Sequence, residues 1–128
     1  MTIQYINPPN VHQPLWGYSH AAVCGKTIYI SAQLPLDIDG NLVGPGDPEA
    51  QARQVFQNLK YVLAASGASL FDVVKLTTYL TDLSYRPPAM EMRNEAFGTH
   101  RAPSILAIVS QLPVEGMLIE VDGIAVLD

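Results

Sequence analysis

The chain has 128 residues, a net charge of −5 and a pI near 5.0, and 48% of its residues are apolar while only 15% are charged. This length fits a single domain, residues 1–128, with a substantial core. The low share of charged residues favours an oligomer, because a small monomer normally covers its surface with more of them. The excess of acidic residues disfavours nucleic-acid binding, which needs a basic face.

The cysteine content and the hydropathy of the chain predict the cellular compartment of the protein. A single cysteine, Cys24, excludes an internal disulfide, and its apolar surroundings predict a buried, inert thiol. No stretch is long and apolar enough to span a bilayer, and the first ten residues lack a secretory signal pattern. We therefore expect a cytoplasmic protein without a membrane partner. Nucleotide-binding glycine motifs and His-Glu-x-x-His are absent from the sequence, so no cofactor is expected.

The first part of the chain predicts strands. An extended piece at residues 3–6 is followed by two β-type runs, residues 20–23 and 27–31, which a Gly25-Lys26 turn joins into a hairpin. Residues 33–47 are rich in glycine, proline and aspartate and predict a loop.

A long helix is predicted next. Asp47, Pro48 and Glu49 form a helix start, with a capping acid, a proline in the first turn and a second acid near the positive end of the helix dipole. Apolar residues then recur every three or four positions, which predicts a helix over residues 48–66 that Gly67 ends.

The rest of the chain completes the fold. Residues 72–81 predict a strand, the prolines at 87 and 88 open a second helix through Phe97, and residues 104–109 and 118–126 predict two closing strands. The order predicts an α+β domain, in which one mixed sheet of about six strands carries both helices on one face. The uncovered face is expected to be a subunit interface.

Glu120 is the first candidate for chemistry. It lies inside an apolar strand, MLIEVDGIAV, where lost solvation would raise the pKa of its carboxyl toward the range useful for proton transfer. The alternative is that Glu120 points into solvent or pairs with a lysine, as most acids in strands do, and the residues alone favour this alternative.

The three histidines do not predict a metal site. His12, His20 and His100 lack metal-ligand spacing to one another and to Cys24. His12 and His100 are expected to be surface or partly buried residues. His20 stands at the start of a strand, where it either lines a site or has no functional role.

Two polar side chains could form a pocket wall. Tyr18 follows an irregular, proline-rich approach to a strand, and either lines a pocket or anchors a turn. Ser31 ends a strand and precedes the small Ala32, but has no Gly-x-Ser-x-Gly elbow or nearby base, so we interpret it as a hydrogen-bonding wall residue. Trp16 and Tyr29 are expected to be packing groups.

Five segments in order resemble the RidA/YjgF family. They are residues 17–21 (GYSHA), 29–37 (YISAQLPLD), 49–54 with 58–60 (EAQARQ with NLK), 67–75 (GASLFDVVK) and 119–126 (IEVDGIAV). The resemblance implies a chorismate-mutase-like homotrimer with three clefts between subunits, which hydrolyses reactive imines and enamines without a metal or cofactor. It further implies that Tyr18 and Ser31 line the cleft, and that Glu120 positions or activates the attacking water.

One position departs from the family pattern. Active members carry an arginine that binds the substrate carboxylate, and alignment through Leu112-Pro113 places Ser104 there, with Arg101 three residues earlier. A hydroxyl cannot replace the bidentate charged pair. We therefore expect hydrolysis of small imine or enamine metabolites other than the usual 2-imino acids. The alternative is a non-catalytic trimer that binds a metabolite or a partner protein in the same cleft, and the acidic charge disfavours endoribonuclease activity.

Overall fold

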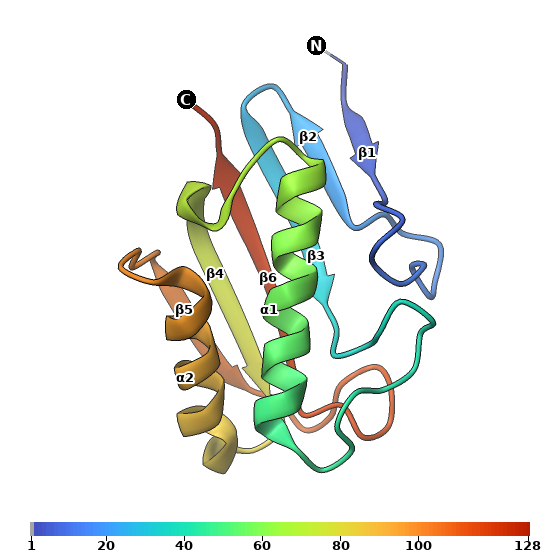
Figure 1. Cartoon of the computed structure of the whole chain (residues 1–128), viewed down its shortest axis with the longest axis vertical. Helices are drawn as coiled ribbons and strands as arrows, with labels where there is room; N and C mark the ends of the chain where they lie inside the picture. Colours follow the sequence, from blue (N-terminus) through green and yellow to red (C-terminus); the bar gives the residue numbers. More distant parts are fainter. Residues whose placement is uncertain (1) are drawn as a thin grey trace.

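Six strands form one mixed sheet in the computed structural model, which describes residues 2–128. The strand order is β1-β2-β3-β6-β4-β5, and only the β4–β5 pair is parallel. The elements are β1 (Gln4–Ile6), β2 (Ala21–Cys24), β3 (Thr27–Gln33), α1 (Pro48–Ala65), β4 (Val73–Leu80), α2 (Arg86–Phe97), β5 (Ser104–Ile108) and β6 (Ile119–Val126) (Figure 1). The predicted fold class, strand number and helix number are confirmed.

The β2–β3 hairpin forms at the predicted turn. Cys24 and Thr27 are paired, which leaves Gly25 and Lys26 as a two-residue connection. Gly25 has φ of 62°, a conformation that tight hairpin turns require and that glycine adopts without strain.

Helix α1 begins and ends as the sequence predicts. The side chain of Asp47 accepts a hydrogen bond from the Ala50 amide at 3.1 Å, and Pro48 is the first helical residue. The helix ends at Ala65, one residue before the expected end, and Gly67 follows with φ of 83°.

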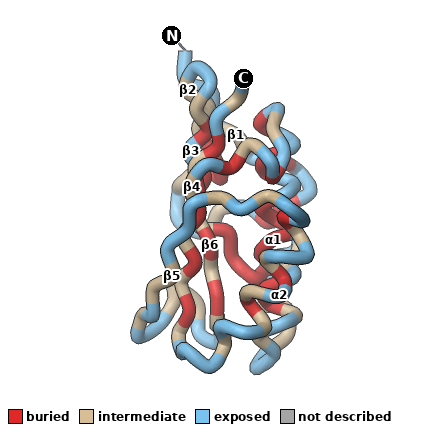
Figure 2. Tube along the Cα trace, turned by 90° about the vertical axis from the view of Figure 1, so that its left-hand side faces the viewer, coloured by how far each residue is buried: buried red, intermediate tan, exposed pale blue. Residues whose placement is uncertain are grey.

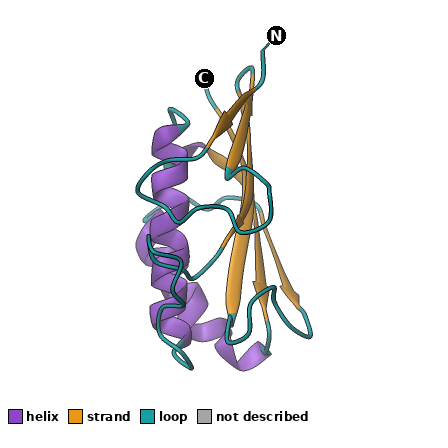
Figure 3. Cartoon of the chain, turned by 90° about the vertical axis from the view of Figure 1, so that its right-hand side faces the viewer, coloured by secondary structure: helices purple, strands orange, loops and turns teal. Residues whose placement is uncertain are grey.

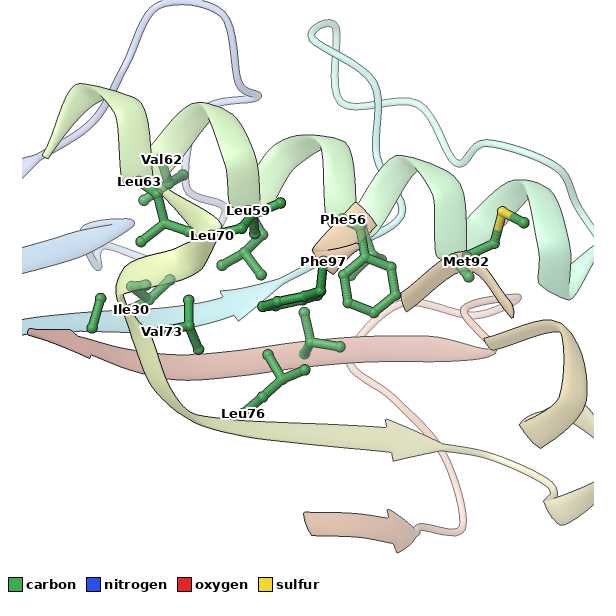
Figure 4. Close-up of a cluster of buried hydrophobic side chains, with 14 of the residues drawn as sticks. Ile30, Phe56, Leu59, Val62, Leu63, Leu70, Val73, Leu76, Met92 and Phe97 are labelled. Carbon is green, nitrogen blue, oxygen red and sulfur yellow. The ribbon is translucent and has the colours of Figure 1, made fainter. Parts of the chain in front are cut away.

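Both helices cover the same face of the sheet (Figure 3). Buried residues concentrate in the layer between helices and sheet (Figure 2). The rings of Phe56 on α1 and Phe97 on α2 meet edge to face at 6.1 Å, over a floor that includes Leu76 of β4 (Figure 4). In the described part of the chain, no helix is both long and apolar enough to cross a membrane.

The other face of the sheet has no covering layer (Figure 3). It carries exposed apolar side chains, among them Tyr29 at 52%, Ile105 at 50% and Val126 at 41% exposure. Trp16, in the loop before β2, is 58% exposed. Trp16 and Tyr29 are therefore not core packing groups of the chain as expected, because strand alternation and an irregular loop direct them outward.

Candidate active site

Glu120 stands on the open face of the central strand β6. Strand alternation turns its neighbours Ile119 and Val121 into the core, so the carboxyl group points the other way. Its Oε2 atom is nevertheless buried and has no hydrogen-bond partner among the described residues. Burial raises the pKa of Glu120, and the negative charge of Asp122 raises it further. This carboxyl group can therefore both accept and return a proton at higher pH than an ordinary glutamate.

Ser31 reaches the same region through an irregularity in β3. The pairing of β3 with β6 shifts between Ile30 and Gln33, as in a β-bulge, a feature that often re-aims side chains beside active sites. The Ser31 hydroxyl donates to the Ser19 carbonyl at 2.6 Å. Its proton is thus committed, and it can offer only acceptor lone pairs to a ligand.

Tyr18 is presented by a glycine turn. Gly17 has φ of 69°, and Tyr18 follows it as a half-buried residue. Burial raises the pKa of Tyr18 and the nearby charge of Glu120 adds to this, which together outweigh the lowering by a hydrogen bond with the Leu15 backbone. The phenol therefore stays protonated and can act as a donor beside Glu120.

These side chains line one concave site of about 320 Å³. Its walls are formed by Trp16, Tyr18, Ser31, Ala32, Leu34, Pro113 and Glu120. Glu120 is the only ionisable carboxyl group among them, and neither lysine nor arginine lines the site. A second hollow of about 480 Å³ shares Tyr18 and Ser31 and extends over the open face to Tyr5 and Tyr29.

Comparison with known proteins identifies the family. The family model described as Endoribonuclease L-PSP matches residues 9–127 of the chain. The chain belongs to the RidA/YjgF family. A RutC family protein of Pyrococcus horikoshii is 37% identical over 116 residues, which cover 91% of each chain.

Two further relatives extend over nearly the whole RidA/YjgF domain. A protein of Dermatophagoides farinae named 2-iminobutanoate/2-iminopropanoate deaminase is 30% identical over 123 residues, 96% of this chain and 95% of its own. The crystal structure of RidA from the Antarctic bacterium Psychrobacter has a TM-score of 0.90 at 34% identity, covering 97% of this chain and 99% of that chain. The RidA resemblance read from the five segments is therefore confirmed.

His20 does not line the concave site around Glu120. It is fully buried, its Nε2 donates to the His12 carbonyl at 2.8 Å, and its Nδ1 accepts from Gln33 Nε2 at 3.3 Å. Gln33 also donates to the Ser31 carbonyl at 3.1 Å, so this network holds the bulge of β3. Burial lowers the pKa of His20 and keeps it neutral, as the two contacts require.

His12 and His100 were both expected to be surface or partly buried residues, and the structure confirms this only for His100. His12 is 1% exposed, so the prediction of a surface or partly buried position is wrong. Its Nδ1 lies 2.9 Å from the Gln13 carbonyl, and its ring meets that of His20 edge to face at 5.0 Å. His100 is partly buried, as expected, and contacts the Val73 carbonyl. Within residues 2–128, no three histidine, cysteine, aspartate or glutamate side chains gather closely enough to hold a metal ion.

Ser104 and Arg101 lie in a different cavity of the chain. Both line a hollow beside α2, and Glu120, Tyr18 and Ser31 line none of its walls. The Arg101 guanidinium donates to the carbonyls of Gly98 and His100. Of the predicted site residues, one chain therefore brings together Glu120, Tyr18 and Ser31. The other three, Ser104, Arg101 and His20, lie outside this site.

Sequence reasoning missed Gln51, a buried residue of α1 that supports the site. Its Nε2 donates to the carbonyls of Gly44 and Gly116, and its Oε1 accepts from the Leu118 amide at 2.8 Å. It thus fixes the chain two residues before Glu120. A signal was present, since Gln51 is a polar residue adjoining the apolar stripe of α1, one turn before Val55.

Proposed function

We propose that this protein hydrolyses reactive imines or enamines in a cleft between the subunits of a homotrimer, with Glu120 as the catalytic acid and base. The observation that carries the proposal is the setting of Glu120, a half-buried carboxyl group with a raised pKa and an unpartnered Oε2 at the wall of a concave site. A carboxyl group whose pKa is raised in this way is a candidate for proton transfer in a reaction. The named deaminase activity of the Dermatophagoides relative supports the reaction class.

The reaction needs one group that takes part in two proton transfers, first as a base and then as an acid. Water attacks the carbon of the protonated imine, the carbon–nitrogen π electrons return to nitrogen, and the Glu120 carboxylate takes the proton that water releases. The Glu120 acid then protonates the amino group of the carbinolamine, and the carbon–nitrogen bond breaks as the hydroxyl oxygen forms the carbonyl double bond. The hydroxyl proton passes to the departing ammonia, so that a carbonyl compound and ammonium leave. We expect Tyr18 to donate a hydrogen bond, and Ser31 to accept one, during these steps.

The lining of the site argues for substrates without the usual carboxylate. A 2-imino acid entering this site would bring its carboxylate next to Glu120, with no cation in the part of the wall that this chain supplies. Desolvating such a carboxylate unpaired costs on the order of a few kcal/mol, or about a hundredfold in binding. We expect uncharged or cationic imines with apolar substituents, which suit Trp16, Leu34 and Pro113.

A pair of matched substrates tests this proposal. An amine oxidase generates butan-1-imine from butylamine, and an amino-acid oxidase generates 2-iminobutanoate from 2-aminobutanoate, and semicarbazide trapping follows the decay of each imine. We expect the protein to accelerate decay of butan-1-imine about a hundredfold more efficiently than that of 2-iminobutanoate. Equal efficiency would contradict the substrate preference, and no acceleration of either would favour the non-catalytic binding function.

A further inference from the structure

Trp16 is an aromatic side chain without a ring partner at the wall of the candidate active site. Its indole is 58% exposed in the loop before β2, and it lines the same hollow of about 320 Å³ as Glu120. The ring contacts among residues 2–128 join other side chains, and Trp16 takes part in none of them. The face of the indole is therefore available to a ligand that enters the hollow.

The electrostatic charge around this hollow is negative. Glu120 is the carboxyl group in its wall, and neither lysine nor arginine lines it. Asp122 lies two residues further along β6, on the same face of the sheet, and its charge acts on Glu120. The Tyr79 hydroxyl that donates to Asp122 at 3.2 Å is neutral, and neither acid forms an ion pair within residues 2–128. A cation is therefore attracted to this hollow and a second carboxylate is repelled.

The buried oxygen of Glu120 lacks a hydrogen-bond donor. Its Oε2 atom has no partner in the described part of the chain, and a buried acceptor that stays unpaired is costly. The N–H groups of an ammonium ion or of a protonated imine supply both the donor and the positive charge. Such charge-assisted hydrogen bonds are about twice as strong as neutral ones. Among aromatic rings, the indole is the one that attracts a cation over its face most strongly.

We propose that Trp16 and Glu120 together bind the positively charged nitrogen of a ligand, so that the site takes N-protonated imines and alkylammonium ions of similar size. Glu120 accepts the N–H group through one oxygen, which leaves its second oxygen for the attacking water. Trp16 is then a specificity-determining residue that selects the protonated imine over its neutral form. Binding of the imine rests on the proposed function, whereas binding of an alkylammonium ion requires no hydrolysis.

Titration calorimetry of the full chain with butylammonium tests the cation site, with butan-1-ol as the neutral comparison ligand and butanoate as the anionic one. We expect saturable butylammonium binding that is about tenfold or more tighter than the binding of either comparison ligand. Trp16 is the only tryptophan of the chain, so its fluorescence reports on the site directly. Butylammonium should change this fluorescence saturably, with the Kd that calorimetry gives.

Substitutions separate the two contacts. Trp16→Leu keeps an apolar side chain but removes the aromatic face, and it should weaken butylammonium binding about fivefold or more. Trp16→Phe restores an aromatic face and should recover part of this loss. Glu120→Gln should weaken butylammonium binding about tenfold or more. Tyr61→Leu is the matched control, because Tyr61 is an exposed aromatic residue of α1 outside the hollow, and it should bind butylammonium as the wild type does.

The cation site and the proposed hydrolysis can fail independently. Absence of butylammonium binding, equally tight binding of butan-1-ol or butanoate, unchanged affinity in Trp16→Leu, or an equal loss in Tyr61→Leu would each overturn the cation site. Imine hydrolysis can persist beside any of these results, and butylammonium can bind as expected to a protein that hydrolyses no imine. Should Glu120→Gln unfold, as circular dichroism would reveal, the two Trp16 variants decide, because Trp16 lies in an exposed loop.

Discussion

Glu120 illustrates how a single residue acquires its properties from its neighbours. Its direction follows from the sequence, because the apolar residues on either side must point into the core. Its burial does not, since that depends on the bulge in β3 and on a loop that brings Pro113 close, neither of which has a local signature. His20 shows the same limit, since strand pairing and the distant Gln33 make it a buried structural residue.

The pKa of Glu120 leads to a prediction for Asp122→Asn. Asp122 raises the pKa of Glu120 through its negative charge, after burial as the larger cause. Removing that charge lowers the pKa of Glu120, so the carboxylate persists to lower pH. The acidic limb of the pH–rate profile should therefore move to lower pH. The Tyr79 hydroxyl, which donates to Asp122 at 3.2 Å, keeps an oxygen acceptor in this variant.

The profile of kcat/KM against pH checks this shift, with Asp128→Asn as the control. Asp128 is exposed at the chain end and carries the same charge change. A limb that stays in place in Asp122→Asn, or that moves equally in both variants, would show that the titrating group is not Glu120 under the influence of Asp122.

At the scale of elements, the helices and strands were predictable to within about two residues of their bounds because their signals are local, although β3 runs to Gln33, two residues beyond its expected end at Ser31. The Asp47-Pro48 start of α1 and the Gly25 turn act through hydrogen bonds and backbone angles within a few residues. The sheet order was not predictable in the same way. That β6 inserts between β3 and β4 is set by long-range pairing, and this insertion places Glu120 in the middle of the sheet.

The close approach of β6 and β4 predicts the effect of Gly123→Ala. A Cβ atom at this position would lie 2.9 Å from the Lys75 carbonyl oxygen, and backbone cannot move aside as a flexible side chain can. We expect the free energy of unfolding to fall by about 1–3 kcal/mol, the usual cost of forcing an extra methyl group into a packed interior. Urea denaturation monitored by circular dichroism measures it. An unchanged midpoint would mean that the two strands separate at this position at no cost.

At the scale of the whole molecule, the main question that the sequence raised was what covers the face of the sheet opposite the helices. The low charge content predicted an oligomer and the element order predicted an interface on this face, and the structure has exposed apolar side chains there, including Tyr29, Ile105 and Val126. A single chain leaves the hollows at Tyr18 and Ser31 open on this face. A trimer stays a prediction, and it would account for both observations.

Ile105→Glu tests the assembly. Ile105 is 50% exposed on the uncovered face, and an unpaired carboxylate buried in an interface costs several kcal/mol. We expect native mass spectrometry to find a trimer for the wild type and a monomer for this variant, which should also lose imine hydrolysis. Leu83→Glu is the control, since Leu83 is 59% exposed in the short turn before α2. A monomeric wild type would contradict the intersubunit cleft.

The most direct test of the account is the rate of imine hydrolysis by Glu120→Gln beside Glu115→Gln. Both variants replace one carboxylate by an amide of the same shape, but Glu115 is an exposed loop residue outside the candidate site. We expect Glu120→Gln to lower kcat for butan-1-imine about a hundredfold or more, with fold and assembly unchanged. Glu115→Gln should stay within about twofold of the wild type. A Glu120→Gln protein that hydrolyses the imine at the wild-type rate would contradict the central role of this carboxyl group.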